Sequence, residues 1–180
     1  MKKTLLILLF ISISSFSQHT DRYLKLMENF IFQDSIKIEK KYKNGNRKFI
    51  ETLYTYKIKG KSKIYKFNVG YSASWLKNGD LFWEIKYDNY GTALYYRAMT
   101  LDGNLSKELI TTKIDTKSDD IRKALGSSKY LIFETYEKQY EVSKDNQPCL
   151  VWEGAKSRGK KIGVWKKYNC CGEIVKTKNY

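Results

Sequence analysis

Residues 159–175 read GKKIGVWKKYNCCGEIV, and this stretch near the end of the chain decides the predicted fold. Its glycines stand before and between two short runs of branched and aromatic residues. Glycine readily adopts the positive φ that tight hairpin connections need, and Val, Ile, Trp and Tyr fit a pleated, half-buried strand. The stretch therefore predicts one β-hairpin unit, and much of the chain before it looks like looser copies of that unit.

The chain before this hairpin alternates between apolar and polar residues with a period of two, interrupted by turn signals. Asn44-Gly45 is the strongest short hairpin signal among them. Gly79, Gly91 and Gly103 are twelve residues apart, which suits strand, turn and strand. The twenty-four residues from Gly79 to Gly103 predict a two-strand repeat. We therefore expect a mainly β protein built from antiparallel hairpin repeats.

Two segments depart from this pattern. Residues 20–32 carry apolar side chains at helical spacing, and Thr20 is a candidate N-cap for a short N-terminal helix. A second short helix is possible near residues 116–125, with Ser118 as a candidate N-cap and Gly126 as its stop. We expect the first helix to pack on the sheet.

These patterns divide the chain into a leader and one domain. We expect a signal peptide over residues 1–17 and a single β-rich domain over residues 18–180. Within that domain the repeats are degenerate over about residues 39–110 and clear over residues 152–180, and residues 111–148 are expected to be irregular. A mature chain of about 160 residues is long enough for one domain with its own core.

The closing hairpin resembles the variant MORN repeat. That family's pattern is Gly-x-x-x-Gly-x-Trp-x-x-Tyr, followed by a turn glycine and an apolar pair. It is met here by Gly159, Gly163, Trp165, Tyr168, Gly172, Ile174 and Val175. The resemblance is specific over residues 159–180 and weaker over residues 42–107. It implies hairpins stacked into an extended or curled single sheet, in which Trp165 and Tyr168 are structural. Such repeats occur in exported bacterial proteins, and some members carry the label of an antitoxin.

The N-terminus has the features of a secretory signal peptide. Lys2 and Lys3 form a positive region, residues 4–13 are apolar, and residues 15–17 (SFS) offer a cleavage site before Gln18. The apolar run is shorter than the roughly 20 residues that span a bilayer. We expect export to the periplasm or the extracellular space, and no transmembrane segment after cleavage.

The chain is strongly basic. Its formal net charge is +15, and removal of Lys2 and Lys3 with the leader leaves +13. Such a surplus favours acidic partners. The lysines are dispersed, however, which predicts a solvated surface and diffuse, salt-sensitive attraction. The interleaved aromatic residues predict core packing first and stacking on a glycan second.

Three cysteines remain in the mature chain: Cys149, Cys170 and Cys171. In an exported protein, a bridge from Cys149 to one of the other two is plausible. The number is odd, so one thiol would stay free or pair between molecules. Three reduced, partly buried side chains are an equal alternative.

Residues suited to catalysis are scarce. The single histidine, His19, lies beside the expected cleavage site, where we expect it to be disordered. Asp119 and Asp120 suit a helix start. Glu134 and Glu137 could be imagined as glycosidase carboxylates, but we expect both to be solvent-facing strand residues. We therefore expect no catalytic site, no cofactor and no metal.

The function expected from these features is that of an exported, non-enzymatic binding protein. It would present a basic, aromatic surface to a protein, a glycan or an envelope lipid, and we expect no nucleic-acid partner. One alternative is an antitoxin- or immunity-like protein that binds a partner protein. A second alternative is a small secreted hydrolase that uses acidic residues such as Glu134 and Glu137.

Overall fold

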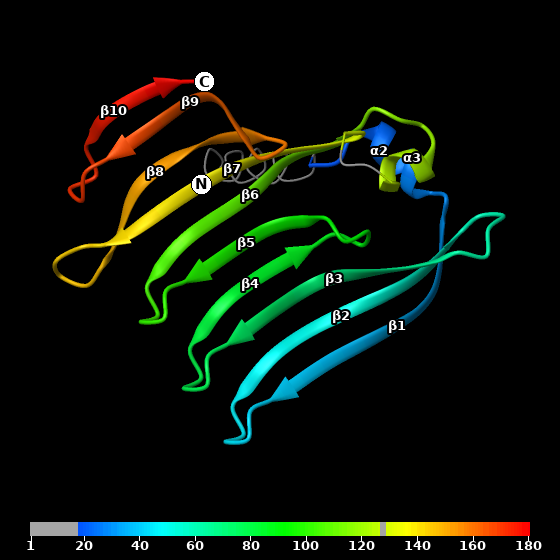
Figure 1. Ribbon diagram of the computed structural model, residues 1–180, viewed down its shortest axis with the longest axis horizontal. Coiled ribbons are helices and arrows are strands. Elements are labelled where there is room, and N and C mark those ends of the chain that lie inside the picture. The colour runs from blue at the N-terminus through cyan, green and yellow to red at the C-terminus, as the bar shows by residue number, and fades with distance from the viewer. Residues whose placement is uncertain (1–17, 127–128) are drawn as a thin grey trace, which may run out of the picture.

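The computed structural model describes residues 18–126 and 129–180, so the expected signal peptide lies outside the described residues. Ten strands form one antiparallel sheet, in which each strand pairs with the next along the chain (Figure 1). The strands are β1 (Phe30–Lys41), β2 (Arg47–Ile58), β3 (Ile64–Trp75), β4 (Leu81–Tyr87), β5 (Ala93–Met99), β6 (Leu105–Thr116), β7 (Leu131–Val142), β8 (Pro148–Ser157), β9 (Lys160–Tyr168) and β10 (Ile174–Asn179). The expected fold class, a single sheet of stacked antiparallel hairpins, is confirmed.

The turns at one end of the sheet repeat a single geometry. In each turn, the backbone carbonyl of the first residue accepts a hydrogen bond from the N–H of the residue three positions later. The backbone N–H of the first residue donates to the carbonyl of the residue four positions later. The first residues are Tyr42, Leu76, Thr100, Ser143 and Asn169. The residue three positions on has a positive φ in every case: Gly45, Gly79, Gly103, Asn146 and Gly172. The predicted turns at Gly45, Gly79 and Gly103 are therefore confirmed.

The sheet continues through the segment that was expected to be irregular. β6 extends to Thr116 and β7 covers Leu131–Val142, and these two strands pair along almost their full length. A register shift between Thr111 and Lys113 moves every later side chain of β6 to the other face. This shift hides the period of two, which is why the strand pattern is hard to read there.

Both helices are shorter than expected. α2 (Asp21–Met27) begins as predicted, because the Tyr23 N–H donates to the Thr20 hydroxyl at 3.3 Å. It ends before Phe30, which starts β1 and pairs with Ile58. The apolar residues at 30–32 fit either a helix or a strand, and pairing with β2 decides between the two.

α3 (Ile121–Gly126) begins after Asp120. The Arg122 N–H donates to the Asp120 carboxylate at 2.9 Å, so Asp120 occupies the capping position. The Ser118 hydroxyl instead accepts the N–H of Asp120 at 3.1 Å, in the loop before the helix. The expected N-cap was therefore two residues too early.

The core lies at one end of the sheet, under the two helices. β4 and β5 have seven residues each, whereas β3 and β6 on either side have twelve. The helices pack beside the ends of the longer strands (Figure 1). The buried cluster there comprises Tyr23, Leu26, Met27, Phe30, Tyr56, Ile58, Ile114, Ile121 and Ala124. The chain before α2 also joins the sheet, because Ile114 of β6 exchanges backbone hydrogen bonds with Gln18 and Thr20.

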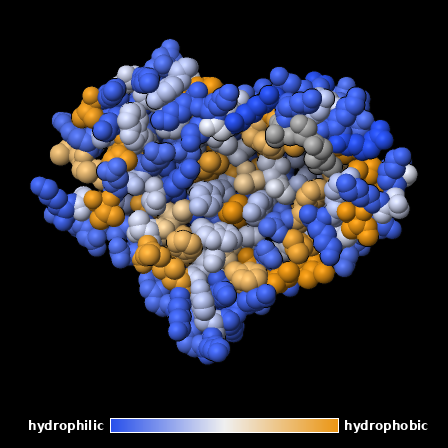
Figure 2. Space-filling model, viewed as in Figure 1, coloured by the Kyte–Doolittle hydropathy of each residue, from blue (hydrophilic) through white to orange (hydrophobic). Residues whose placement is uncertain are grey.

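The two faces of the sheet differ in chemistry. We call the face that carries the core and the helices the inner face, and the opposite one the outer face. Tyr96 and Leu109 lie opposite each other on the inner face, and the neighbouring pair Arg97 and Glu108 lies on the outer face. In the view of Figure 2, mostly pale side chains with some orange ones gather at the centre, and blue, hydrophilic ones make up most of the rim, with orange patches between them.

Candidate functional site

A row of alternating charges crosses the outer face. Six residues occupy one line of cross-strand partners from β4 to β9: Glu84, Arg97, Glu108, Lys138, Glu153 and Lys166. Arg97 Nη2 lies 2.7 Å from Glu84 Oε1. Opposite charges directly across a strand pair are stabilising, and a slip by one residue would break the whole row. The row therefore fixes the register of the central strands.

Tyrosine hydroxyls satisfy the carboxylates of this row. Tyr95 donates to Glu108 at 3.1 Å, and Tyr140 donates to the other oxygen of Glu108 at 2.7 Å. Tyr168 donates to Glu153 in the same way, and this hydrogen bond raises the pKa of Tyr168 to about 12. Burial and the hydrogen bond to Glu108 likewise raise the pKa of Tyr140. The polar groups of the outer face are thus largely used within the sheet.

The inner face holds an apolar groove beside the core. Its volume is about 450 Å³. It is lined by Phe67, Tyr90, Gly91, Thr92, Ala93, Leu109, Thr111, Leu131, Phe133 and Thr135. These residues come from β3, the turn before β5, and strands β5 to β7, so the groove runs across the middle of the sheet. The volume lies within the range of about 300–1,000 Å³ that is usual for small-ligand sites.

Glu137 stands on the same face, beyond the end of the groove. It is 1% exposed, so the expectation of a solvent-facing residue was wrong. Lys156 Nζ lies 2.8 Å and Lys107 Nζ 3.0 Å from its Oε2, and Gln139 donates to its Oε1. Burial by itself would raise the pKa of Glu137, but the hydrogen bonds from Lys156, Lys107 and Gln139 outweigh burial and lower it. The carboxylate is therefore a buried, charged centre whose two oxygens are both occupied.

Glu134 and Glu137 do not form a catalytic pair. They lie three residues apart on β7, whose residues from Leu131 to Gln139 pair one after another with β6, since the extra residue of the register shift belongs to β6. Their side chains therefore point to opposite faces. Glu134 is half-buried on the outer face. The geometry that two glycosidase carboxylates need across one substrate is absent from this pair.

A group of lysines and aromatic rings surrounds Glu137 on the C-terminal side. We call this group, together with Lys107 on the other side of Glu137, the lysine–tryptophan cluster; its other members are Trp152, Lys156, Lys161, Trp165, Lys167 and Tyr180. Lys161 Nζ lies 4.1 Å from the centre of the Trp165 ring and 5.1 Å from that of Trp152. Lys167 lies 5.8 Å from the Trp152 ring. These distances are within the range of cation–π attraction.

Trp165 is the centre of this cluster. It is 0% exposed, and its indole N–H donates to the Ala155 carbonyl at 2.8 Å. Its ring lies flat over Gly154, where a Cβ would come within 2.5 Å of the ring atoms. Glycine at position 154 is therefore required for this close approach.

The other residues of the repeat pattern are placed at turns and irregularities. Gly159 has φ +78° in the β8–β9 turn, and Gly172 has φ +82° in the β9–β10 turn. Gly163 has φ +61° inside β9, where the register against β8 shifts between Glu153 and Ala155. This shift in β9 brings Trp165 over Gly154.

A disulfide joins Cys149 to Cys170. It ties the start of β8 to the turn between β9 and β10. Cys171 is free and exposed. The sequence left the choice between the two neighbours open, because it does not reveal which side of the last turn faces β8.

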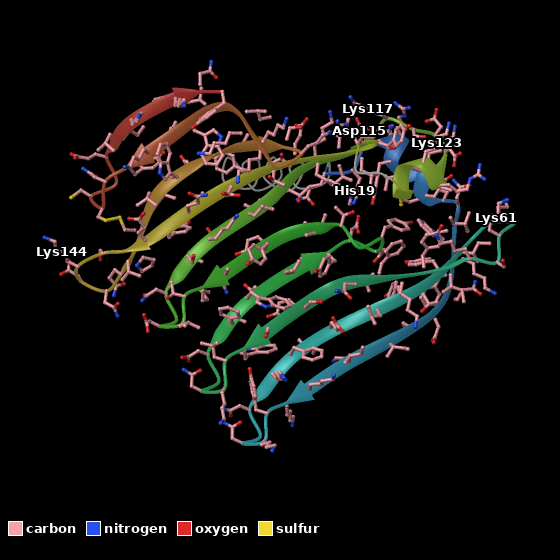
Figure 3. The ribbon with its side chains drawn as sticks, viewed as in Figure 1. His19, Lys61, Asp115, Lys117, Lys123 and Lys144 are labelled. Atoms are coloured by element: carbon pink, nitrogen blue, oxygen red, sulfur yellow. A yellow bond between two sulfur atoms is a disulfide. The ribbon has the colours of Figure 1, made fainter. Side chains whose placement is uncertain are left out.

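His19 is ordered, contrary to expectation. Its ring stacks on Tyr23, and its Nε2 lies 2.8 Å from Asp88 Oδ2. The other oxygen of Asp88 accepts the N–H groups of Tyr90 and Thr92 in the β4–β5 turn. Figure 3 shows His19 beside the helices. The contact between His19 and Asp88 holds the N-terminal segment against the sheet. The two residues are 69 positions apart, and no local sequence pattern predicts such a contact.

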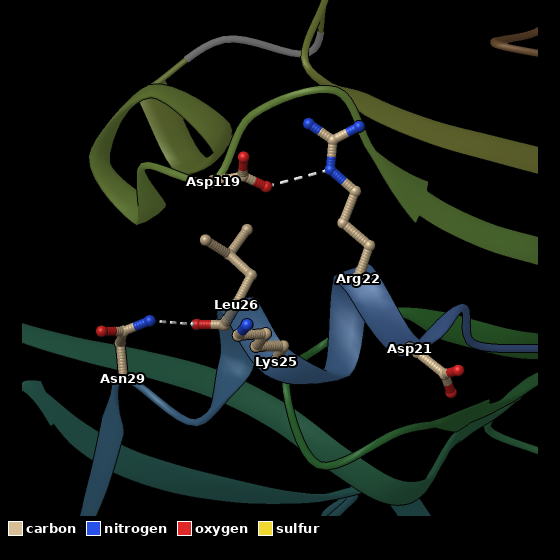
Figure 4. A pocket seen from close by; sticks show the side chains of 6 residues that line it. All are labelled: Asp21, Arg22, Lys25, Leu26, Asn29 and Asp119. Atoms are coloured by element: carbon tan, nitrogen blue, oxygen red, sulfur yellow. Dashed lines mark hydrogen bonds and ion pairs between the residues drawn. The ribbon is translucent and has the colours of Figure 1, made fainter.

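Another hollow lies beside α2 and has a volume of about 540 Å³ (Figure 4). Its lining is mostly exposed, with Arg22 Nε 3.0 Å from Asp119 across the opening. Only Leu26 in it is buried, so it offers no convergent buried polar group. Within the described ranges, no three acidic, histidine or cysteine side chains come together as metal ligands would.

None of the helices in residues 18–126 and 129–180 is both long and apolar enough to cross a bilayer. Comparison of the chain with protein-family models, curated proteins and solved structures gives no match. The resemblance to the variant MORN repeat therefore stays a prediction, and the function must be argued from the groove, the lysine–tryptophan cluster and the contrast between the two faces.

Proposed function

We propose that the protein is an exported, non-enzymatic binding protein whose inner face receives its partner. The observation that carries this proposal is the difference between the two faces. The two helices of the described residues cover one end of the inner face, and beyond them lies an apolar groove next to a basic, aromatic cluster. The outer face instead uses its charges and hydroxyls within the sheet. An uncovered apolar surface rimmed by polar groups is typical of an interaction site.

The side chains that could support catalysis have structural partners, which favours binding over chemistry. Glu137 is held by two lysines and a glutamine, and Asp88 is held by His19 and two backbone N–H groups. A general acid or base needs free access to a substrate proton. The partner classes we propose are a protein, a glycan or an envelope lipid.

Export is the second part of this proposal. It rests on the positive region, the apolar run and the cleavage triplet of residues 1–17. The Cys149–Cys170 disulfide supports it, because disulfides persist in oxidising compartments. N-terminal sequencing of the purified native protein should start within a residue or two of Gln18. An intact Met1 on a cytoplasmic protein would refute export.

The two faces can be tested with one matched pair of positions. Tyr95 and Tyr96 are neighbours in β5, have the same side chain and point to opposite faces. A photoreactive amino acid is placed at either position and the producing cells are irradiated. We expect covalent adducts from position 96 and few from position 95. Adducts from position 95 alone, or equally from both, would refute the inner face as the binding surface.

A further inference from the structure

The lysine–tryptophan cluster holds more positive charge than its carboxylate can neutralise. Lys107 and Lys156 share the single carboxylate of Glu137. Lys161 lies directly opposite Lys156 in the β8–β9 pair, and like charges in that position repel each other. The ion pairs of the described residues include no carboxylate partner for Lys161 or Lys167. The cluster is therefore a local site of excess positive charge.

The apolar groove ends where these lysines begin. Leu109 lines the groove and is the cross-strand partner of Glu137. Thr135 also lines it and is the partner of Lys156. Partners across an antiparallel pair lie about 5 Å apart and share a face. An apolar surface and a cationic one thus adjoin within one strand spacing.

The fold assembles this cationic surface from distant parts of the chain. Lys107 comes from β6, Lys156 from β8 and Lys161 from β9. Other lysines remain scattered: Lys61 and Lys144 lie at opposite ends of the sheet (Figure 3). The lysines around Glu137 differ from these because a buried carboxylate and two indole rings fix their ammonium groups.

We propose that the groove and the lysine–tryptophan cluster form one binding site for an anionic amphiphile. The apolar chain of the ligand lies in the groove, against Leu109 and Phe133. Its phosphate or carboxylate head accepts hydrogen bonds from Lys107, Lys156 and Lys161. This inference rests on the proposed function and names the chemistry of the ligand at the inner face.

Both halves of the ligand are needed for this site. The head alone would meet three lysines that are partly neutralised by Glu137, and attraction of this kind is screened by salt. The chain alone would bury apolar surface in the groove but leave the excess charge unpaired. A ligand with both parts buries its chain in the groove and places its head beside the lysines. Burial of apolar surface and charge-assisted hydrogen bonds then both contribute to the affinity.

The experiment compares three probes by isothermal titration, each below its critical micelle concentration where it has one. Dodecyl phosphate carries the chain and the anionic head, dodecyl maltoside carries the chain and an uncharged head, and inorganic phosphate carries the head alone. We expect saturable binding of dodecyl phosphate and no saturable binding of phosphate. The affinity for dodecyl maltoside should be weaker by more than about tenfold, because its uncharged head loses the charge-assisted contacts to all three lysines. Equal affinity for the two dodecyl compounds, or phosphate binding as tightly as dodecyl phosphate, would overturn the inference.

Two matched pairs of variants locate the site. Lys161→Gln should weaken dodecyl phosphate about tenfold and leave dodecyl maltoside unchanged, whereas Lys86→Gln, an exposed lysine on the outer face, should change neither. Leu109→Gln should weaken both dodecyl compounds, and Ile110→Gln, the next residue on the outer face, should weaken neither. Equal losses from Lys161→Gln and Lys86→Gln would mean diffuse attraction to the net charge and would overturn the site.

Thermal melting reports whether each variant is folded. If a variant fails to fold, the comparison of the three probes on the unaltered protein still tests the inference. The inference and the proposed function can also fail separately. If position 96 gives adducts and dodecyl phosphate does not bind, the inner face stands and the anionic amphiphile is refuted. If dodecyl phosphate binds with the expected pattern and position 96 gives no adducts, the site stands and the proposed in-cell partner on this face is refuted.

Discussion

The two ends of the sheet are stabilised in different ways. At the helical end, Met27, Phe30 and Ile114 are buried between α2 and the strands, as in any two-layered protein. At the C-terminal end, none of the helices in the described residues covers the sheet. There Trp165 is buried over Gly154, Glu137 is buried among lysines, and a disulfide closes the last turn. A single layer can therefore be stable where one large ring and a fully paired charge replace the second layer.

The same difference explains where a ligand can bind. At the helical end, apolar side chains of the helices and of the inner face are buried together in the core. The C-terminal end and the middle of the sheet leave a groove and lysines within reach of a partner. The alternating row of charges on the outer face runs through both regions, from β4 to β9.

The largest effect should come from Trp165→Ala. Trp165 is fully buried and covers the C-terminal end, so its loss should cost about 3–5 kcal/mol in the free energy of unfolding. Urea denaturation followed by circular dichroism measures this cost. Trp152→Ala is the control, because Trp152 is only half-buried and should cost less. An unchanged melting temperature together with lost binding would make Trp165 a ligand contact and not the replacement for a second layer.

Glu137→Gln should have the next largest effect, about 3 kcal/mol, because it leaves two lysines facing each other without their carboxylate. Glu134→Gln, on the outer face of the same strand, should change stability by less than about 0.5 kcal/mol. Equal effects of the two substitutions would show that the ion cluster contributes nothing special to the uncovered end.

The pH dependence of the Glu137 contribution has a definite sign. The pKa of Glu137 in the folded protein lies below its ordinary value of 4.5, so the carboxylate stabilises the fold above that value. The contribution should be lost as the pH falls below 4.5 and through the folded-state pKa. The difference in the free energy of unfolding between the unaltered protein and Glu137→Gln should therefore shrink as the pH is lowered from 7 to 3. A constant difference across this range would contradict the lowered pKa.

Asp88→Asn should have the smallest effect of the three, about 1–2 kcal/mol. The new amide can still accept the turn N–H groups through its oxygen, but its NH₂ group cannot accept from Tyr23. The loss should appear first as faster amide hydrogen exchange in residues 18–27, at the helical end. Asp102→Asn, at an exposed turn position, serves as the control. Exchange that quickens equally in β8 and β9 would show that the two ends are not stabilised separately.

Local signals determined much of the fold. The turn glycines, the alternation of β2 to β5 and the Thr20 cap depend on backbone preferences of a few neighbouring residues, and all appear where expected. Such preferences are encoded within short windows of sequence, so the meander of hairpins follows from them.

Tertiary structure alone decided what lies beneath and beside the sheet. Phe30 belongs to a strand because β2 is there to pair with it, and His19 is ordered because Asp88 lies next to it. Glu137 is buried because Lys107 and Lys156, from two other strands, close over it. Each of these outcomes depends on a contact between residues far apart in the chain. Burial and electrostatic pairing act through space, and no window of sequence contains both partners.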